Sequence, residues 1–91
     1  MGACIATDKI TVDGLPVHFM YREKPLNETD SGWQFFSGTE TQAYVDDSSN
    51  SAFYAVNTIA NYDPAIIPYL NYPVGSELER VEGSNEFIII S

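Results

Sequence analysis

Alternation of hydrophobic and polar residues predicts several short β-strands along the chain. In Val17–Arg22 successive side chains would point to opposite sides, as in a half-buried strand. One side would carry Val17, Phe19 and Tyr21, and the other His18, Met20 and Arg22. Further strands are predicted at Ala3–Ala6, Trp33–Phe36, Ala52–Thr58, Glu77–Glu82 and Glu86–Ser91.

The last of these strands has its own pattern. Phe87-Ile88-Ile89-Ile90 is apolar at every position, which predicts a central strand buried on both faces. Gly83-Ser84-Asn85 has a length common in hairpins and would join it to the strand before.

Two short helices are expected between the strands. Thr39 followed by Gln42 matches a capping box, so a helix is predicted from Glu40 to about Asp46. Asp63-Pro64 resembles a second helix start, with Asp as the cap and Pro at the first helical position. That helix must be short, because Pro68 lacks a backbone donor and disfavours helical geometry before it.

These elements define the predicted fold class. About five strands and two short helices, without a repeating strand–helix–strand order, favour an α+β fold with a small, mainly antiparallel sheet. Residues 1–91 are expected to form a single domain, since nothing in the chain looks separable.

The charge of the chain limits its partners. Thirteen acidic residues stand against four Lys and Arg, for a net charge of −9, and every charged residue between Lys24 and Arg80 is acidic. Such a field repels nucleic acid and anionic membranes and attracts basic proteins. The alternative is that the acidity only keeps the protein soluble.

The sequence also suggests where the protein resides. Its first residues show no secretory signal, and no apolar run approaches the ~20 residues of a membrane span. Its one cysteine, Cys4, stands among apolar residues and is expected to be a small buried hydrophobe. We therefore expect a cytoplasmic protein in a reducing compartment.

Candidate catalytic groups are few. The single histidine, His18, stands on a predicted strand beside Met20 and Arg22, and Cys4 would need the fold to bring it close. The carboxylate pairs Asp46-Asp47 and Glu40 with Asp63 are the better enzyme candidates. The loop with Asp46 lacks the central glycine and the final glutamate of a calcium-binding EF-hand. We predict no enzyme activity, no cofactor and no metal site.

Aromatic residues among acids are the better candidates for function. Exposed aromatic side chains in a charged field resemble the residues that dominate protein interfaces. Trp33 is expected to lie mainly in the core. The predicted partner-binding residues are Asp30, Glu40, Tyr44, Asp46, Asp47 and Tyr62.

One stretch is similar to a known family. It runs Val56-Asn57-Thr58-Ile59-Ala60-Asn61-Tyr62-Asp63-Pro64 and continues through Pro73-Val74-Gly75-Ser76 to Glu79-Arg80. With Met20-Tyr21-Arg22-Glu23, Asp30-Ser31-Gly32-Trp33 and Phe35-Phe36-Ser37-Gly38, it resembles the bacterial family catalogued as domain of unknown function 2185. That family is grouped with the immunity proteins of polymorphic toxin systems. The family supplies no catalytic residues to carry over.

The resemblance and the charge lead to two hypotheses. The first is an acidic protein-binding module, an immunity protein that neutralises a basic toxin, such as a nuclease, by surface complementarity. The alternative is a stand-alone domain that binds a small ligand, near Tyr62, Tyr69 or Tyr72, or has a regulatory role. Such a domain could form a homodimer through an exposed strand edge. An unrecognised enzyme ranks last.

Overall fold

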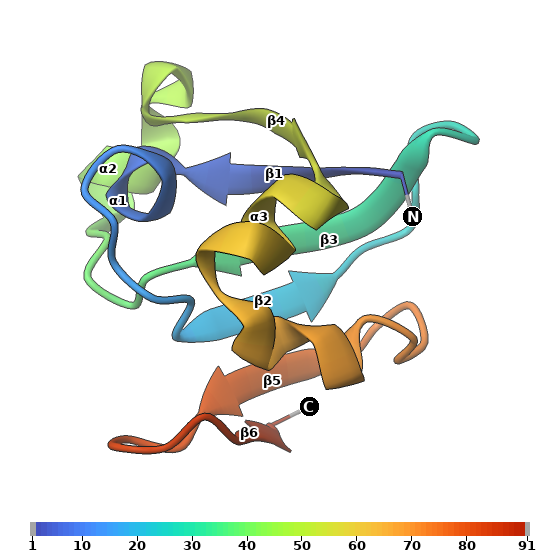
Figure 1. Cartoon of the computed structure of the whole chain (residues 1–91). Helices are drawn as coiled ribbons and strands as arrows, with labels where there is room; N and C mark the ends of the chain where they lie inside the picture. Colours follow the sequence, from blue (N-terminus) through green and yellow to red (C-terminus); the bar gives the residue numbers. More distant parts are fainter. Residues whose placement is uncertain (1, 91) are drawn as a thin grey trace.

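Six strands form one sheet in the computed structural model, which describes residues 2–90 (Figure 1). Their order across the sheet is β4-β1-β3-β2-β5-β6. All neighbouring strands are antiparallel except β1 and β3, which are parallel. The strands are β1 (Ala3–Thr7), β2 (Phe19–Arg22), β3 (Asp30–Phe36), β4 (Ser51–Ala55), β5 (Glu77–Arg80) and β6 (Phe87–Ile89). The predicted α+β class and mainly antiparallel sheet are confirmed.

Short helices connect the strands. The α-helices are α1 (Asp8–Thr11), α2 (Gln42–Asp46) and α3 (Val56–Tyr62), and the 3-10 helices are η1 (Ser48–Asn50) and η2 (Pro64–Tyr69). In Figure 1, α1, α3 and η2 lie in front of the sheet. No helix in residues 2–90 is long and apolar enough to cross a bilayer.

The hydrophobic core lies between the sheet and the layer of α3 and η2. Every second strand residue points into it, and α3 adds Val56 and Ile59, which share one face of the helix. The fully buried side chains include Cys4, Ala6, Ile10, Val17, Met20, Trp33, Phe35, Ile66 and Leu78. Trp33 is therefore a core residue, as predicted, and its indole nitrogen donates to the carbonyl of Leu70 at 3.1 Å.

A buried ion pair ties the helical layer to the sheet. Arg80 of β5 pairs with Asp63, and each side chain is only 10% exposed. Asp63 also accepts from the backbone N–H of Val17 at 2.9 Å, while Arg80 donates to the Val17 carbonyl at 2.8 Å. Asp63 caps η2 through the N–H of Ala65, which confirms the helix start predicted at Asp63-Pro64.

The predicted strand Ala52–Thr58 is wrong in its second half. The strand ends at Ala55, and α3 begins at Val56. Val56 and Ile59 have helical spacing and both are fully buried against the sheet, so tertiary packing overrides the strand preference of valine. Asn57 consequently lies inside the helix.

The predicted helix start at Thr39 is also wrong. Thr41 is the cap of α2, and its hydroxyl accepts from the N–H of Tyr44 at 3.1 Å. Glu40 precedes the helix and accepts from the N–H groups of Ser37 and Gly38. The carboxylate of Glu40 therefore binds the N–H groups of this turn, and the capping box predicted between Thr39 and Gln42 is not formed.

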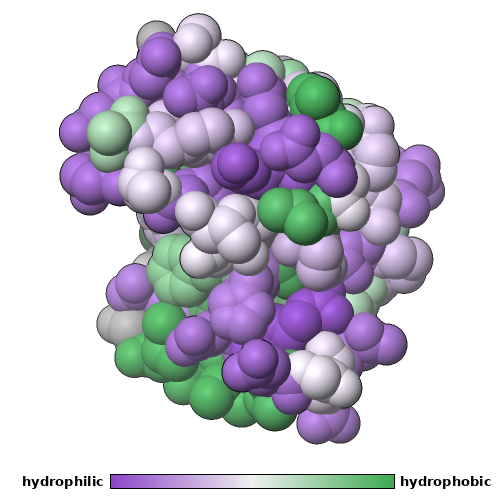
Figure 2. All heavy atoms as spheres, turned by 90° about the vertical axis from the view of Figure 1, so that its left-hand side faces the viewer, coloured by the Kyte–Doolittle hydropathy of each residue, from purple (hydrophilic) through white to green (hydrophobic). Residues whose placement is uncertain are grey.

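The strand predicted to be central lies at the edge of the sheet. Within residues 2–90, β6 pairs only with β5, and Ile88, Ile89 and Ile90 are 53%, 61% and 47% exposed. The predicted hairpin with β5 is present, whereas Ser91 lies outside the described residues. Figure 2 shows the resulting apolar patch at the lower edge of the molecule. An apolar run alone cannot distinguish a covered strand from an uncovered one.

Candidate partner-binding surface

The sheet face opposite α3 and η2 carries side chains that are exposed or half-buried. Strand register identifies them. Phe19 lies between Phe36 and Glu79, and Tyr21 between Gln34 and Glu77. Ile5 pairs with Gln34 on one side and with Phe53 on the other. The open face is defined here by Ile5, Phe19, Tyr21, Gln34, Phe36, Phe53, Glu77 and Glu79.

Three aromatic rings form the centre of the open face. Phe19, Tyr21 and Phe36 lie with their ring centres 5.7–6.0 Å apart, and the rings of Tyr21 and Phe36 are stacked. All three are half-buried. The predicted alternation in Val17–Arg22 is thus present in β2, but the covered side is that of Met20. Sequence alternation separates the two faces without indicating which one the helices cover.

Two shallow hollows lie on either side of this aromatic cluster. The first, about 310 Å³, is lined by the three rings with Gly38, Glu40 and Val45. The second, about 420 Å³, is lined by Tyr21, Arg22, Glu23, Lys24, Val74, Gly75 and Glu77. Because Tyr21 lines both, the hollows form one continuous surface.

Carboxylates surround the aromatic cluster. Glu23 accepts from the side-chain amide of Gln34 at 2.8 Å, and Gln34 in turn accepts from the Tyr21 hydroxyl at 2.8 Å. Burial, together with the negative charge of Glu23, raises the pKa of Tyr21 to about 12. Glu79 lies 3.5 Å from the imidazole of His18. The aromatic centre of the surface therefore has carboxylates close to it, while Arg22 and Lys24 also line the second hollow.

Four of the six predicted binding residues lie around α2. Glu40 and Tyr44 are half-buried, whereas Asp46 and Asp47 are exposed. Although partial burial pushes the pKa of Glu40 upward, hydrogen bonds from Thr7 and Ser37 outweigh it and hold that pKa below its ordinary value. Glu40 is thus ionised at neutral pH where it lines the first hollow.

The polar groups of α2 are held by local contacts. Asp46 accepts from Gln42 at 2.8 Å, and Asp47 caps η1 through the N–H of Ser49 at 3.0 Å. The ammonium of Lys9 lies 5.2 Å from the ring centre of Tyr44. Tyr44 therefore already has a cationic neighbour within the chain.

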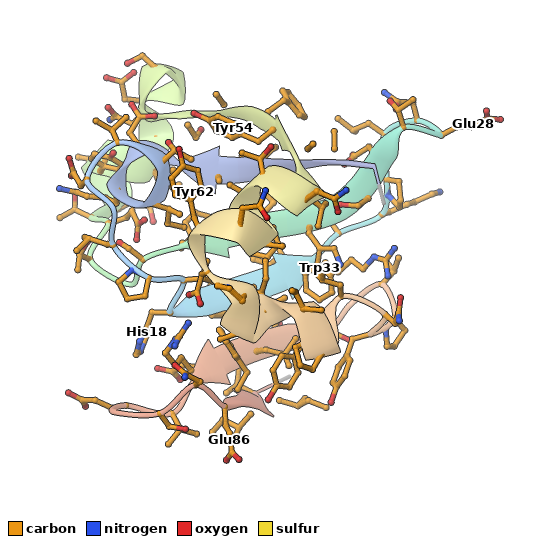
Figure 3. The ribbon with its side chains drawn as sticks, in the orientation of Figure 1. His18, Glu28, Trp33, Tyr54, Tyr62 and Glu86 are labelled. Carbon is orange, nitrogen blue, oxygen red and sulfur yellow. The ribbon has the colours of Figure 1, made fainter. Side chains whose placement is uncertain are left out.

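The other two predicted residues lie elsewhere. Asp30 begins β3 while α2 follows its far end, which separates them by about 20 Å of extended strand. Its carboxylate accepts from the N–H groups of Leu26 and Gly32. Tyr62 ends α3, on the covered side of the sheet, and is 56% exposed (Figure 3). The sequence alone did not show that Asp30 and Tyr62 lie apart from the residues around α2.

The candidate catalytic groups are dispersed. Cys4 is fully buried, and burial raises the pKa of its thiol to about 12. Asp63 pairs with Arg80, whereas Glu40 bonds to Thr7 and the Ser37–Gly38 backbone, so these two carboxylates do not form a pair. Within residues 2–90, no group of three or more His, Cys, Asp or Glu side chains is placed to hold a metal ion.

Comparison with known proteins adds one finding. A family model described as the immunity protein Imm33 domain matches residues 4–91. Searches of curated proteins and of solved structures give no match. The match confirms the grouping with immunity proteins that the resemblance implied, while membership of the family numbered 2185 stays a prediction.

Proposed function

The chain belongs to the Imm33 immunity protein family, and we propose on this premise that it is a non-enzymatic protein that neutralises a toxin by binding it. The match over residues 4–91 is the observation that carries the proposal, because it spans nearly the whole fold. Immunity by binding also fits a chain whose Cys4 thiol is buried and whose Asp63 carboxylate is engaged in a structural ion pair.

The charge of the chain supports a basic toxin surface, such as that of a nuclease. A net charge of −9 would steer a basic partner toward the protein and accelerate association. The acids around α2 and the open face would supply the attraction, and the aromatic cluster would supply apolar contact area. Among the predicted residues, Glu40, Tyr44, Asp46 and Asp47 lie nearest this surface, while Asp30 and Tyr62 would take part only through a larger interface.

Growth rescue tests the proposal. The open reading frame beside this gene is expressed in a bacterial host from an inducible promoter, alone or with the immunity protein in the cytoplasm. We expect the neighbouring product to stop growth, and this chain to restore it. The purified pair should associate tightly at about 50 mM salt and at least tenfold more weakly at about 500 mM. A toxic neighbour that this chain neither binds nor neutralises would refute the proposal.

The role of the predicted acids is tested by charge reversal. Asp46→Lys with Asp47→Lys should slow association with the toxin several-fold, since both side chains are exposed and close to the open face. Glu28→Lys with Glu82→Lys changes the net charge equally in two loops and serves as the matched control. Equal slowing in both variants would assign the effect to overall charge.

A stand-alone domain that dimerises is the second candidate, and the exposed edge of β6 favours it. An edge strand presents unpaired backbone groups, and Ile88–Ile90 add apolar surface to them. Sedimentation of the purified chain distinguishes the candidates. A dimer that Ile88→Lys converts to a monomer would support this reading, and a monomer at about 100 μM would argue against it.

A further inference from the structure

The first hollow of the open face combines aromatic rings, an exposed aliphatic side chain and carboxylates. Phe19, Tyr21 and Phe36 form its floor, and Val45 of α2, 43% exposed, stands at its side. Glu40 lines the same hollow, and Glu79 is the cross-strand neighbour of Phe19. An apolar floor between anionic groups is suited to a side chain that is both flat and cationic.

The free acceptor positions of these carboxylates point to a donor from outside the chain. A carboxylate oxygen has two acceptor positions. The Oε2 of Glu40 accepts from Thr7 and from the Ser37 N–H, whereas its Oε1 accepts only from the Gly38 N–H. The carboxylate of Glu79 lies 3.5 Å from the imidazole of His18, and its side chain is 48% exposed. Each carboxylate therefore retains room for a charged donor.

We propose that this hollow is the seat for an arginine side chain presented by the toxin, stacked on the aromatic cluster with Glu40 and Glu79 as its counter-charges. The inference rests on the proposed function and names the partner chemistry of its binding surface. Guanidinium is favoured over ammonium because it is planar, stacks on aromatic rings and is more weakly hydrated. The chain uses the same contact internally, since Arg22 and Arg80 lie 5.6 and 5.0 Å from the ring centres of Trp33 and Phe87.

A second copy of this chain does not fit the seat. Two open faces brought together would set Glu77 and Glu79 of one copy against those of the other. The arginines of a second copy are engaged as well, because Arg22 donates to the carbonyls of Ser31 and Tyr72 and Arg80 pairs with Asp63. The volume of about 310 Å³ is at the lower limit of small-molecule sites, and a shallow hollow of that size suits a single side chain.

Binding of a defined probe tests the seat directly. The isotope-labelled full chain is titrated with the blocked tripeptide Gly-Arg-Gly, and with its lysine and citrulline counterparts, while backbone amide, aromatic and methyl NMR signals are recorded. We expect the arginine peptide to shift the ring signals of Phe19, Tyr21 and Phe36 and the methyl signals of Val45. The lysine peptide should need at least a threefold higher concentration, and the uncharged citrulline peptide should have little effect.

Matched variants locate the binding. Val45→Lys places an ammonium at the hollow and should weaken arginine-peptide binding at least tenfold. Val12→Lys makes the same change at another exposed valine, 73% exposed, and should leave binding unchanged. Glu79→Gln should weaken it at least threefold, with Glu82→Gln as its control. Retained melting temperatures show that each variant is folded. Equal binding of arginine and lysine peptides, or shifts spread over Glu28, Asp46 and Glu86, would overturn the seat.

The same variants separate this inference from the proposed function. Val45→Lys should weaken the toxin complex and growth rescue, whereas Val12→Lys should not. Neutralisation that is unaffected by both Val45→Lys and Glu79→Gln would overturn the seat and leave the immunity function standing. If the chain binds arginine at this hollow but neutralises no toxin, the seat would be supported. The proposal that a toxin presents the arginine would then be overturned.

Discussion

At the scale of single residues, the buried pair of Asp63 and Arg80 is a polar contact that ties the helical layer to the sheet. Asp63→Ala would leave the Arg80 guanidinium unpaired in a site where it is 10% exposed, and would remove the acceptor of the Val17 N–H. We expect the free energy of unfolding to fall by about 3–5 kcal/mol. Urea denaturation followed by tryptophan fluorescence measures it.

The control for that change is an exposed pair. Lys9 and Asp13 lie 3.7 Å apart with side chains 32% and 52% exposed, so Asp13→Ala should cost less than about 1 kcal/mol. Similar losses in both variants would show that the buried position of Asp63 contributes nothing special to stability.

Two residues make stability depend on alkaline pH. Burial raises the pKa of Cys4 from 9.0 and that of Tyr21 from 10.0, each to about 12. The unfolded chain therefore releases these protons at lower pH than the folded protein. Below about pH 9 both groups are protonated in both states, and between about pH 9 and 12 the free energy of unfolding should fall.

Denaturation at several pH values measures this decline. Cys4→Ala removes the contribution of the thiol, so its stability should fall less between about pH 9 and 12 than that of the parent protein. A parent protein whose stability is constant across this range would contradict the assignment of the two groups.

At the scale of elements, Gly32 determines whether β3 can pair on both sides. It has a φ of 85°, and the register between β1 and β3 is irregular at this point, between the pairs Ala3–Asp30 and Ile5–Gln34. A Cβ at Gly32 would overlap the carbonyl oxygen of Glu23. Gly32→Ala should therefore destabilise the protein by well over the ~1–2 kcal/mol of a left-handed backbone alone.

Gly83 provides the comparison. It has a φ of 77° in the β5–β6 turn, and a Cβ there would meet nothing within 4 Å. Gly83→Ala should cost only about 1–2 kcal/mol, the strain of its backbone conformation. Thermal unfolding of both variants tests the difference, and equal midpoints would contradict it.

Local signals predicted those elements whose cause is local. Asp63-Pro64 starts a helix because the cap and the proline act within a few residues, and Gly83 closes a hairpin for a similar reason. Two of the errors, at Val56 and at Phe87–Ile89, arose where distant packing decides. Val56 lies in a helix because its side chain is buried against the sheet. Phe87–Ile89 is an edge strand because no further strand lies beside it in the described chain.

At the scale of the whole molecule, the net charge of −9 should oppose folding through self-repulsion. Raising sodium chloride from about 10 to 200 mM shortens the screening length, so the melting temperature should rise by a few degrees. Glu28→Lys with Glu82→Lys lowers the magnitude of the charge by four, and this variant should respond less. A melting temperature that falls with salt would contradict the argument.

The candidate surface was only partly predictable. The excess of acids and the resemblance to immunity proteins indicated protein binding, and Glu40 does line the aromatic hollow. Phe19, Tyr21 and Phe36 were not predicted as surface residues, because aromatic residues on a strand fit a buried core equally well. Only the arrangement of α3 and η2 decides which sheet face stays uncovered, and that arrangement is a property of the complete fold.

The contact of Arg80 with Asp63 and Val17 has a consequence for synthesis on the ribosome. β1 pairs with β3 and β4, whereas β2 pairs with β3 on one side and with β5 on the other. Strands β1 to β4 can pair early, but the second edge of β2 and the carboxylate of Asp63 lack their partners from β5 until translation has passed Arg80, and such non-local pairing is slow to form. Under the proposed function, protection would begin only after this last contact has formed, so survival should be better when this chain is translated before the toxin that it neutralises.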